Sequence, residues 1–440
     1  MDRRVGVSIL GCGVVGSATA EMLLSERNEL ADRVGVDLEV RSILVRNPDL
    51  NRPGLIPTEL FTTEFKHSLH DPETQIIVEL IGGVTAAREF TLAALRAGKD
   101  VVTANKALLA LHGAEVFAAA RASGRCIAFE AAVGGGIPLI ESIRRGLAAN
   151  QIDAIYGILN GTSNYILTRM GDGKVAYADA LAEAQKLGFA EADPSLDVEG
   201  IDSAHKLCVL ASVAMREACD FSQITHHGIT DIEVTDLVAG EALGYVCRLL
   251  AMARRHDAGV TLCVRPMFVP TSHPLAGVRG PFNAVSIYGD AAGHVMFYGR
   301  GAGGRPTASA VISDIVEVAC GNTARVFESR KDLPDRTPAA RHAGGEDRVS
   351  AFYLRVGLQD KPGGMAAVAQ SLGDQGVSIA SLVQHQPHET HTSDAVPVVV
   401  VTHPAKEQSV RAAIRTMSNV DYVVGRVVCI PILDDDAASA

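Results

Sequence analysis

A glycine-rich string near the start of the chain constrains the fold more than any other feature. Residues 5–10 form a short apolar run typical of a buried strand, and apolar residues recur at helical spacing from residue 15 onward. The string between them has the pattern G-x-G-x-x-G and consists of Gly11, Cys12, Gly13, Val14, Val15 and Gly16. The first glycine permits a tight turn, the second lets the backbone approach a pyrophosphate, and the third allows close helix packing. This strand–loop–helix context predicts dinucleotide binding, and the alternative is an incidental glycine-rich turn.

Short β-rich runs alternate with helical patterns through the first third of the chain. Further strands are predicted at residues 38–45, 76–81, 101–102 and 126–130. Helices are predicted between them, at residues 86–97 and 114–122. This alternation is typical of a doubly wound parallel sheet, so we assign residues 1–137 to an α/β Rossmann nucleotide-binding domain, completed by a helix at about residues 305–330.

The rest of the chain predicts two more domains. Helices mixed with hairpin-like strands indicate an α+β domain at residues 138–304. A segment rich in Pro, Gly and charge makes 331–349 a predicted linker. The order βαββαβ at residues 350–432 predicts a ferredoxin-like domain, and 433–440 is predicted to be a flexible tail. Three domains agree with the length of 440 residues at roughly 150 residues per domain.

Composition narrows the possible partners. The chain has 40 basic and 51 acidic residues, a net charge of -11, and no basic block, so nucleic acid and anionic membranes are not expected. Its longest apolar runs are far shorter than the ~20 residues of a membrane helix. The eight cysteines are scattered without a Cys-x-x-Cys pair, which is typical of reduced residues. These features predict a cytoplasmic protein.

The end of the second predicted strand should distinguish NAD from NADP. An NAD enzyme places Asp or Glu there to hold the ribose 2′-hydroxyl. Here the strand ends with Arg46, and the next acidic residue is Asp49, beyond Pro48. An arginine can pair with a 2′-phosphate, so we favour NADP(H). The alternative is that Arg46 is an ordinary surface arginine and that both cofactors, NAD(H) included, are used.

Two lysines are candidates for chemistry. Lys106 follows a short strand and Thr103, at the sheet edge where open α/β sheets bind ligands. Lys206 lies four residues after Asp202 on a predicted helix, so the two side chains share a face. A surface salt bridge is the simpler interpretation of that spacing. The functional one is that the carboxylate holds a substrate amine while the lysine exchanges a proton with a substrate oxygen; burial or a neighbouring cation would lower the lysine pKa.

Two further motifs have both structural and functional interpretations. Glu130 is followed by a run of glycines whose carbonyls could turn inward and, with the carboxylate, bind a hard cation. From these residues alone, a flexible hinge between domains is the preferred interpretation. The polar string at residues 160–164 opens a helix predicted to begin near Tyr165. There Thr162 or Ser163 could be the N-cap or could bind a small polar substrate.

Taken together, these strings resemble the homoserine dehydrogenase family along the whole chain. The resemblance rests on GCGVVG, VELIGG, TANKALLA, FEAAVGGGIPLI, LNGTSNYIL, GFAEADPSLDVEGIDSAHKL and YGRGAGGRPTAS. The carboxy-terminal unit resembles an ACT domain, and the arrangement is similar to the single-function bacterial type. The resemblance implies NADP(H)-dependent interconversion of L-homoserine and L-aspartate 4-semialdehyde, on the route to threonine, methionine and isoleucine.

The resemblance also implies roles for individual residues. Lys206 matches the proton donor to the aldehyde oxygen, and Lys106 matches a second active-site lysine near nicotinamide and substrate. The other matching residues are substrate-binding Glu191, Asp202, Asp197 and Gly188; a sodium site at Glu130, Val133, Gly135 and Ile137; and Gly303 near the cofactor. The family further implies a dimer interface in the substrate domain, hence a homodimer or homotetramer, and suggests L-threonine as an ACT effector.

Two other functions deserve comparison. A different NADP-linked dehydrogenase with an ACT domain, such as a hydroxy-acid enzyme, would need a catalytic His or Arg and does not explain LNGTSNYIL. A non-catalytic amino-acid sensor would be expected to have lost Lys106 or Lys206, and both are present.

Overall fold

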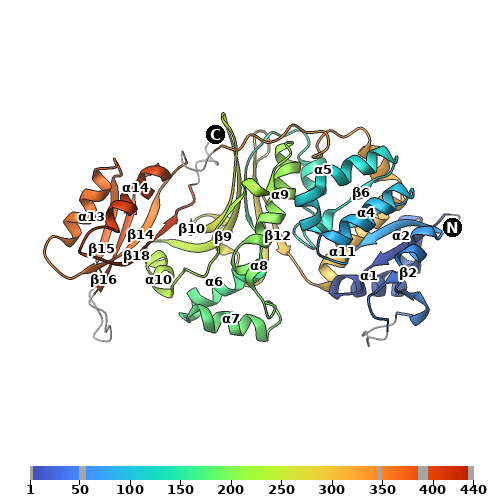
Figure 1. Ribbon diagram of the computed structural model, residues 1–440, viewed down its shortest axis with the longest axis horizontal. Coiled ribbons are helices and arrows are strands. Elements are labelled where there is room, and N and C mark those ends of the chain that lie inside the picture. The colour runs from blue at the N-terminus through green and yellow to red at the C-terminus, as the bar shows by residue number, and fades with distance from the viewer. Residues whose placement is uncertain (1–2, 49–55, 344–347, 385–394, 435–440) are drawn as a thin grey trace.

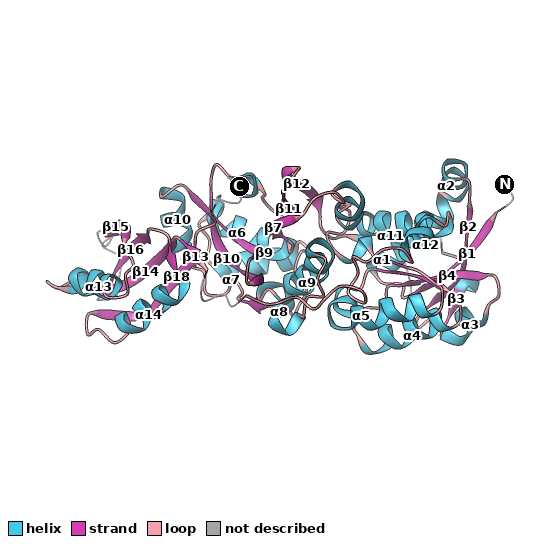
Figure 2. Cartoon of the chain, turned by 90° about the horizontal axis from the view of Figure 1, so that it is seen from above, coloured by secondary structure: helices cyan, strands magenta, loops and turns pink. Residues whose placement is uncertain are grey.

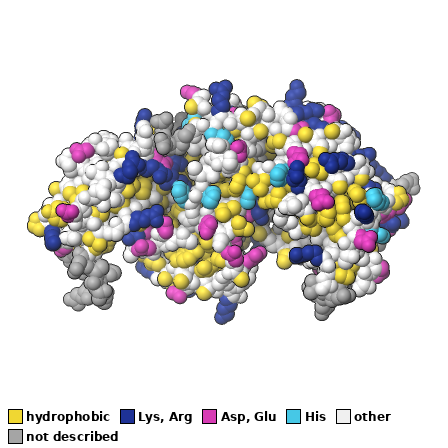
Figure 3. Space-filling model, viewed as in Figure 1, with side chains coloured by type: hydrophobic (Ala, Val, Ile, Leu, Met, Phe, Trp, Pro, Cys, Tyr) yellow, Lys and Arg dark blue, Asp and Glu magenta, His cyan; other side chains and the backbone are white. Residues whose placement is uncertain are grey.

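The computed structural model describes residues 3–48, 56–343, 348–384 and 395–434. Three units follow one another along the long axis, with the amino-terminal domain at one end and the carboxy-terminal domain at the other (Figure 1). The view from above shows the same linear order, with the central sheet between the two outer units (Figure 2). On the face drawn in Figure 3, acidic side chains are interspersed among basic ones. Among the described residues, no helix combines the length and apolarity needed to cross a membrane.

The amino-terminal unit is built on a parallel sheet of six strands in the order β3-β2-β1-β4-β5-β6. This order confirms the doubly wound sheet, whose ligand crevice lies where strand order reverses, outside β1 and β4. The strands are β1 (Arg4–Leu10), β2 (Asp37–Leu44), β3 (Phe61–Thr62), β4 (Thr74–Glu79), β5 (Asp100–Thr103) and β6 (Ile127–Ala128). The helices are α1 (Val14–Ser25), α2 (Arg27–Val34), α3 (Phe65–His70), α4 (Thr85–Arg96) and α5 (Lys106–Ala122).

A late segment returns to this first unit, as the sequence predicts. It forms α11 (Gly304–Ala319) and α12 (Asn322–Phe327), separated by Gly321, which has a φ of 79°. The beginning of α11 lies against the beginning of α1, since a Cβ placed on Gly304 would lie 3.1 Å from the Val14 carbonyl oxygen. The glycine loop and the 301–304 turn therefore lie side by side.

The central unit has a mixed sheet in the order β12-β11-β7-β9-β10-β8. Its strands are β7 (Ile152–Ile158), β8 (Thr225–His226), β9 (Tyr245–His256), β10 (Gly259–Pro270), β11 (Phe282–Gly289) and β12 (Gly293–Arg300). Its helices are α6 (Gly161–Gly173), α7 (Tyr177–Lys186), α8 (Ser195–Val198), α9 (Ile201–Met215) and α10 (Val234–Ala242). Helix α9 is buried along most of its length and contacts α5, so it connects the central sheet with the nucleotide-binding domain.

The apolar pattern at residues 140–149 predicts a helix, and the structure forms only a short π-helix there, η3 (Ser142–Gly146). Two preceding turns, η1 (Thr58–Leu60) and η2 (Glu130–Ala132), and two later ones, η4 (Phe221–Gln223) and η5 (Pro274–Gly277), are 3₁₀ helices.

The predicted linker follows the surface of the central domain. The amide of Ala218 donates to the Pro338 carbonyl, and the amide of Val260 donates to the Arg341 carbonyl, both at 2.7 Å. Arg121 of the nucleotide-binding domain pairs with Asp335, and both side chains are buried. Backbone hydrogen bonds and this ion pair therefore fasten the segment on its way to the third unit.

The third unit has the predicted βαββαβ order, with an antiparallel sheet arranged β15-β16-β14-β18. Its elements are β14 (Phe352–Gln359), α13 (Gly364–Gly373), β15 (Ile379–Gln384), β16 (Ala395–Thr402), α14 (Glu407–Met417) and β18 (Val423–Pro431), with a small pair formed by β13 (Val349–Ser350) and β17 (Ala405–Lys406). Most of the predicted tail, residues 435–440, lies outside the described residues.

Buried ion pairs join this third unit to the central sheet. Glu407, at the start of α14, accepts hydrogen bonds from Arg265 of β10 at 2.9 and 3.1 Å, and also pairs with Arg348. Asp236 of α10 is fully buried and accepts from Arg355 and from the Tyr353 hydroxyl. The carboxy-terminal unit is therefore fixed to the domain that it follows.

Candidate active site

The glycine loop follows β1, at the point where the strand order of the parallel sheet reverses. Gly11 has a φ of 101°, and a Cβ there would lie 2.6 Å from the Leu80 carbonyl oxygen. A Cβ on Gly16 would lie 2.1 Å from the Gly11 carbonyl oxygen, whereas one on Gly13 would meet nothing within 4 Å. Val14 at the start of α1 is 74% exposed, and Val15 follows it. Gly11 and Gly16 are therefore required by the turn itself, while Gly13 leaves open space beside the helix N-terminus, which fits a pyrophosphate.

A chain of hydrogen bonds positions Lys106 at the start of α5. Asn105 caps this helix, since its side-chain oxygen accepts from the Leu108 amide at 3.0 Å. Thr103, at the end of β5, accepts from the Asn105 amide and donates to the buried Glu79 carboxylate at 2.7 Å. Glu79 ends β4, and burial raises the pKa of its carboxyl group. The ends of two parallel strands thus hold the loop from which Lys106 extends.

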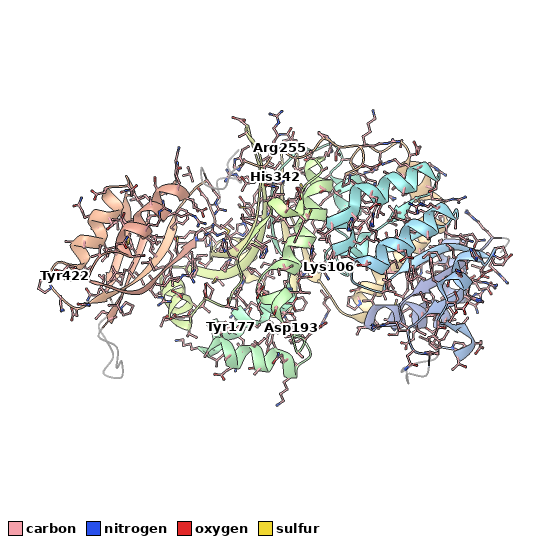
Figure 4. The ribbon with its side chains drawn as sticks, in the orientation of Figure 1. Lys106, Tyr177, Asp193, Arg255, His342 and Tyr422 are labelled. Atoms are coloured by element: carbon pink, nitrogen blue, oxygen red, sulfur yellow. The ribbon has the colours of Figure 1, made fainter. Side chains whose placement is uncertain are left out.

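Both predicted lysines contact one carboxylate. The Lys206 Nζ lies 2.7 Å from Asp202 Oδ2, and the Lys106 Nζ lies 3.1 Å from Asp202 Oδ1. Asp202 and Lys206 are buried on α9, whereas Lys106 is half-buried and comes from the other domain. Figure 4 shows Lys106 at the border between these domains. The i,i+4 pair is therefore a buried pair in the interdomain space, and the surface salt bridge is excluded.

Electrostatics favour the charged forms of Asp202 and Lys106. Burial alone would raise the pKa of Asp202, but the ammonium groups of Lys206 and Lys106 hold it well below its ordinary value. Asp202 in turn raises the pKa of Lys106, against the effect of burial and with smaller help from Asp197 and Glu191. At Lys106, attraction to the carboxylate therefore outweighs the desolvation that burial alone would cause.

Asn160 completes the cluster. Its Nδ2 donates to Asp197 Oδ1 at 2.7 Å and to Asp202 Oδ2 at 2.9 Å, so it bridges two carboxylates. Its Oδ1 accepts from the Ser163 amide, which makes Asn160 the N-cap of α6. The helix consequently begins at Gly161, four residues earlier than predicted, because the first polar residue of the string provides the cap.

The two hydroxyl groups of this string make structural hydrogen bonds. Ser163 donates to the Asp197 carbonyl at 2.8 Å, and Thr162 donates to the Phe189 carbonyl at 2.6 Å. Both side chains are buried. They fasten the segment 189–197, which carries Glu191 and Asp197, to the start of α6.

The remaining predicted residues lie at more exposed positions. Glu191 is exposed, and it lies close enough to Lys106 to contribute to its raised pKa. Gly188 has a φ of 74° in the turn before it, where a left-handed backbone favours glycine. Gly303 has a φ of 119° and precedes α11, beside the glycine loop. Arg46 is exposed beyond β2, and its neighbours from Asp49 to residue 55 lie outside the described residues.

Comparisons with known proteins agree with this geometry. Residues 11–130 match the homoserine dehydrogenase NAD-binding domain, 138–316 match homoserine dehydrogenase, and 352–418 match the ACT domain. The chain is 42% identical over 428 residues to the homoserine dehydrogenase of Pseudomonas aeruginosa, covering 96% of this chain and 98% of that one. It is 35% identical over 428 residues to that of Bacillus subtilis, covering 96% of each.

A solved homoserine dehydrogenase from Thiobacillus denitrificans has the same fold, with a TM-score of 0.90 at 40% identity over 98% of this chain and 99% of that one. The chain belongs to the homoserine dehydrogenase family. Its activity is that of the family, and it combines an NAD(P)-binding domain, a catalytic domain and an ACT domain. A hyperthermophilic archaeal homoserine dehydrogenase in complex with NADPH resembles it with a TM-score of 0.60 at 28% identity, over 72% of this chain and 98% of that one.

In the segment predicted to bind a cation, the Glu130 carboxylate already accepts hydrogen bonds from the backbone. The two oxygens of Glu130 accept backbone amides from Ile140 at 2.9 Å and Glu141 at 2.8 Å. The Ile137 carbonyl accepts the Leu139 amide at 2.8 Å. Burial raises the pKa of Glu130. Burial and the nearby Glu130 carboxylate raise the pKa of Asp314, which accepts a hydrogen bond from the Glu130 amide. Backbone donors thus already satisfy the side chain that was expected to bind sodium, and Val133 and Gly135 offer carbonyls only.

Sequence reasoning missed Asn160 and Glu79 as parts of the site. Asn160 was part of a recognised string, but amide groups that bridge carboxylates 37 and 42 residues away have no local pattern. Glu79 is the last residue of β4, at the sheet edge where ligands bind. That position is the sequence feature that could have identified Glu79 as part of the site.

Proposed function

We propose that this homoserine dehydrogenase prefers NADP(H) and interconverts L-homoserine and L-aspartate 4-semialdehyde with Lys206 as the proton donor to the aldehyde oxygen. The strongest support is that Lys106 and Lys206, which come from different domains, both pair with the Asp202 carboxylate. Negative charge develops on the substrate oxygen during reduction, and a nearby ammonium group neutralises and protonates it.

Bound NADP(H) supplies the hydride. Lys206 is anchored for proton transfer by Asp202 and by the Leu159 carbonyl, to which it donates at 2.8 Å. Lys106 adds a second cation on the nucleotide-domain side. Asp202 and Glu191 would hold the substrate ammonium group, and Asp197, tied to Asp202 through Asn160, adds further negative charge. Thr162, Ser163 and Gly188 shape this side of the substrate site.

The cofactor would bind along the glycine loop, with its pyrophosphate at Gly13 and the start of α1, where the open space was found. Arg46 would pair with the 2′-phosphate, and Thr103, Lys106 and Gly303 would lie near the nicotinamide half. The direct test follows absorbance of NADPH with aspartate semialdehyde and repeats the assay with NADH. No turnover with either cofactor, or a preference for NADH, would contradict the proposal.

Regulation and assembly extend the proposal. L-threonine would inhibit through the ACT domain, tested by titrating threonine into the assay with the intact chain. A homodimer or homotetramer in the cytoplasm is expected, and light scattering measures its mass.

A sodium ion would bind through backbone carbonyls near Val133, Gly135 and Ile137 more than through Glu130. Replacing Na⁺ by choline at constant ionic strength should lower activity, and unchanged activity would contradict the sodium site.

A further inference from the structure

A half-open cavity of about 300 Å³ lies at the end of α9 opposite to Asp202 and Lys206. Its walls come from η3 and the turn after it, the carboxyl end of α9, and residues 330–332 at the start of the predicted linker. A helix rises ~1.5 Å per residue, so Met215 lies on the order of 14 Å along the axis from Lys206. The cavity is thus separate from the active site but shares a rigid helix with it.

Basic side chains dominate the cavity walls. Four of the lining residues are basic, namely Arg144, Arg216, Arg330 and Lys331, and one is acidic, Asp332. Asp332 already pairs with Arg330 at 2.7 Å and with Arg144 at 3.3 Å. Burial alone would raise the pKa of Asp332, but the two arginines hold it below its ordinary value. One carboxylate cannot neutralise four cations, so the cavity has an excess of positive charge.

A second acidic group, Glu141, lies beside this cluster but does not remove the excess. Glu141 lies 3.7 Å from the Arg144 guanidinium, but its other oxygen pairs with Arg145, which also pairs with Glu317 at 3.0 Å. Glu141 is therefore shared with an arginine that does not line the cavity.

Two buried polar atoms of the cavity walls have no hydrogen-bond partner among the described residues. They are Nη2 of Arg144, whose side chain is 5% exposed, and Oδ1 of Asp332. Buried polar groups in folded proteins are nearly always satisfied, so an unsatisfied guanidinium nitrogen calls for an acceptor. An anion beside Arg144 would provide that acceptor, whereas the Asp332 oxygen needs a donor and does not itself indicate an anion.

The carboxyl end of α9 does not oppose an anion. Its last carbonyl, of Met215, accepts Arg255 Nη2 at 2.8 Å, and Figure 4 labels Arg255 in this region. Arg216 follows with a left-handed φ of 53°, and its side chain donates to the Ala148 carbonyl at 2.7 Å. Cations therefore compensate the negative end of the helix dipole. The remaining lining is apolar, from Ile143, Leu147, Ala148, Ile152, Val213 and Ala214.

We propose that this cavity is a second ligand site for a small organic anion, in which a carboxylate or phosphate group meets Arg216, Lys331 and Arg144 and a short apolar chain lies on the apolar lining. The proposal does not depend on the catalytic roles given above. Charge selects the anionic group, and apolar contact selects a ligand with a few carbon atoms over a bare ion.

The test measures binding to the intact chain by calorimetry and by thermal unfolding, at constant ionic strength. The probes are acetate, butyrate and inorganic phosphate. Butyrate is expected to bind at least threefold more tightly than acetate, because it adds apolar contact; phosphate alone would instead identify a phosphate ligand. No binding of any probe overturns the proposal.

Variants separate a site from general ionic effects. The double variant Arg216→Gln, Lys331→Gln should lose at least tenfold in affinity, and the single variant Lys331→Gln, at an exposed position, should lose about threefold. Arg145→Gln is the matched control, because it removes a neighbouring charge outside the cavity. Equal binding by wild type and both cavity variants, or an equal loss in the control, would overturn the proposal.

Discussion

The Nζ of Lys206 lies 2.7 Å from the Oδ2 of Asp202, one helical turn earlier on α9, and both side chains are buried. The other oxygen of this carboxylate, Oδ1, pairs with the Nζ of Lys106, which belongs to the neighbouring domain. These two ion pairs link the two domains and place both lysine side chains beside the crevice.

Replacing Lys206 by alanine should lower turnover about 10²- to 10⁴-fold, because general acid catalysis contributes roughly that factor. Binding of NADPH, followed by fluorescence, should change less than threefold, since Lys206 belongs to the catalytic domain. Lys186→Ala, on the exposed end of α7, is the control and should retain full turnover. Near-normal turnover of Lys206→Ala would transfer the proton role to Lys106 or to water.

Reduction and oxidation should respond differently to pH. Asp202 raises the pKa of Lys106, so the ammonium form, which stabilises an alkoxide, persists through neutral pH. Oxidation of homoserine needs a deprotonated base, and its rate should therefore rise with pH beyond the optimum of the reduction. Asp202→Asn should lower the pKa of Lys106 and shift both profiles to lower pH. Profiles that coincide in both directions would contradict this interpretation.

Two glycines of the loop should behave oppositely on substitution by alanine. Gly16→Ala should lower the melting temperature, because the added Cβ would lie 2.1 Å from the Gly11 carbonyl oxygen. Gly13→Ala should leave the melting temperature of the free protein within about 2 °C, since nothing lies within 4 Å, yet weaken NADPH binding at least tenfold. Unaltered cofactor affinity in Gly13→Ala would place the pyrophosphate elsewhere.

Arg46→Glu tests the cofactor preference. A carboxylate beyond β2 can hold a ribose 2′-hydroxyl and repels a 2′-phosphate, so kcat/KM should fall at least tenfold with NADPH and rise with NADH. Lys66→Glu, on α3, provides a control with the same charge change. A ratio of the two activities that is the same in wild type and Arg46→Glu would show that Arg46 does not read the cofactor.

Glu407 should make the attachment of the ACT domain dependent on pH. Arg265 and Arg348 outweigh the opposing effect of burial and lower the pKa of Glu407 to about 2. A carboxylate with a lowered pKa in the folded state stabilises the fold above its ordinary pKa, and this contribution is lost as pH falls from about 4.5 towards 2.

Glu407→Gln should remove the same contribution at neutral pH. It leaves two buried arginines without their carboxylate, which should lower the free energy of unfolding by about 3 kcal/mol in urea titrations at pH 7. The difference from wild type should disappear near pH 2. Arg415→Gln, on the same helix, is the control. An equal effect of both substitutions would mean that the buried pair contributes little.

Much of the fold and part of the site could be predicted because the responsible patterns are local. The strand, the glycine loop and the helix at residues 4–25 follow from periodicity and from backbone conformations that glycine favours. The α+β centre and the βαββαβ unit follow in the same way. The i,i+4 spacing placed Asp202 and Lys206 on one face of a helix, but left open whether that face was buried.

The rest depends on contacts between segments far apart in the sequence. Sequence alone determined the nucleotide fold, the family and the residues able to carry the chemistry, because these depend on local backbone geometry and on side-chain type. Only the tertiary structure decided that Lys106 and Lys206 share Asp202, that Asn160 bridges two carboxylates, and that Glu130 faces backbone amides. Charges act over a few ångströms in space, and that distance is fixed by how the domains pack.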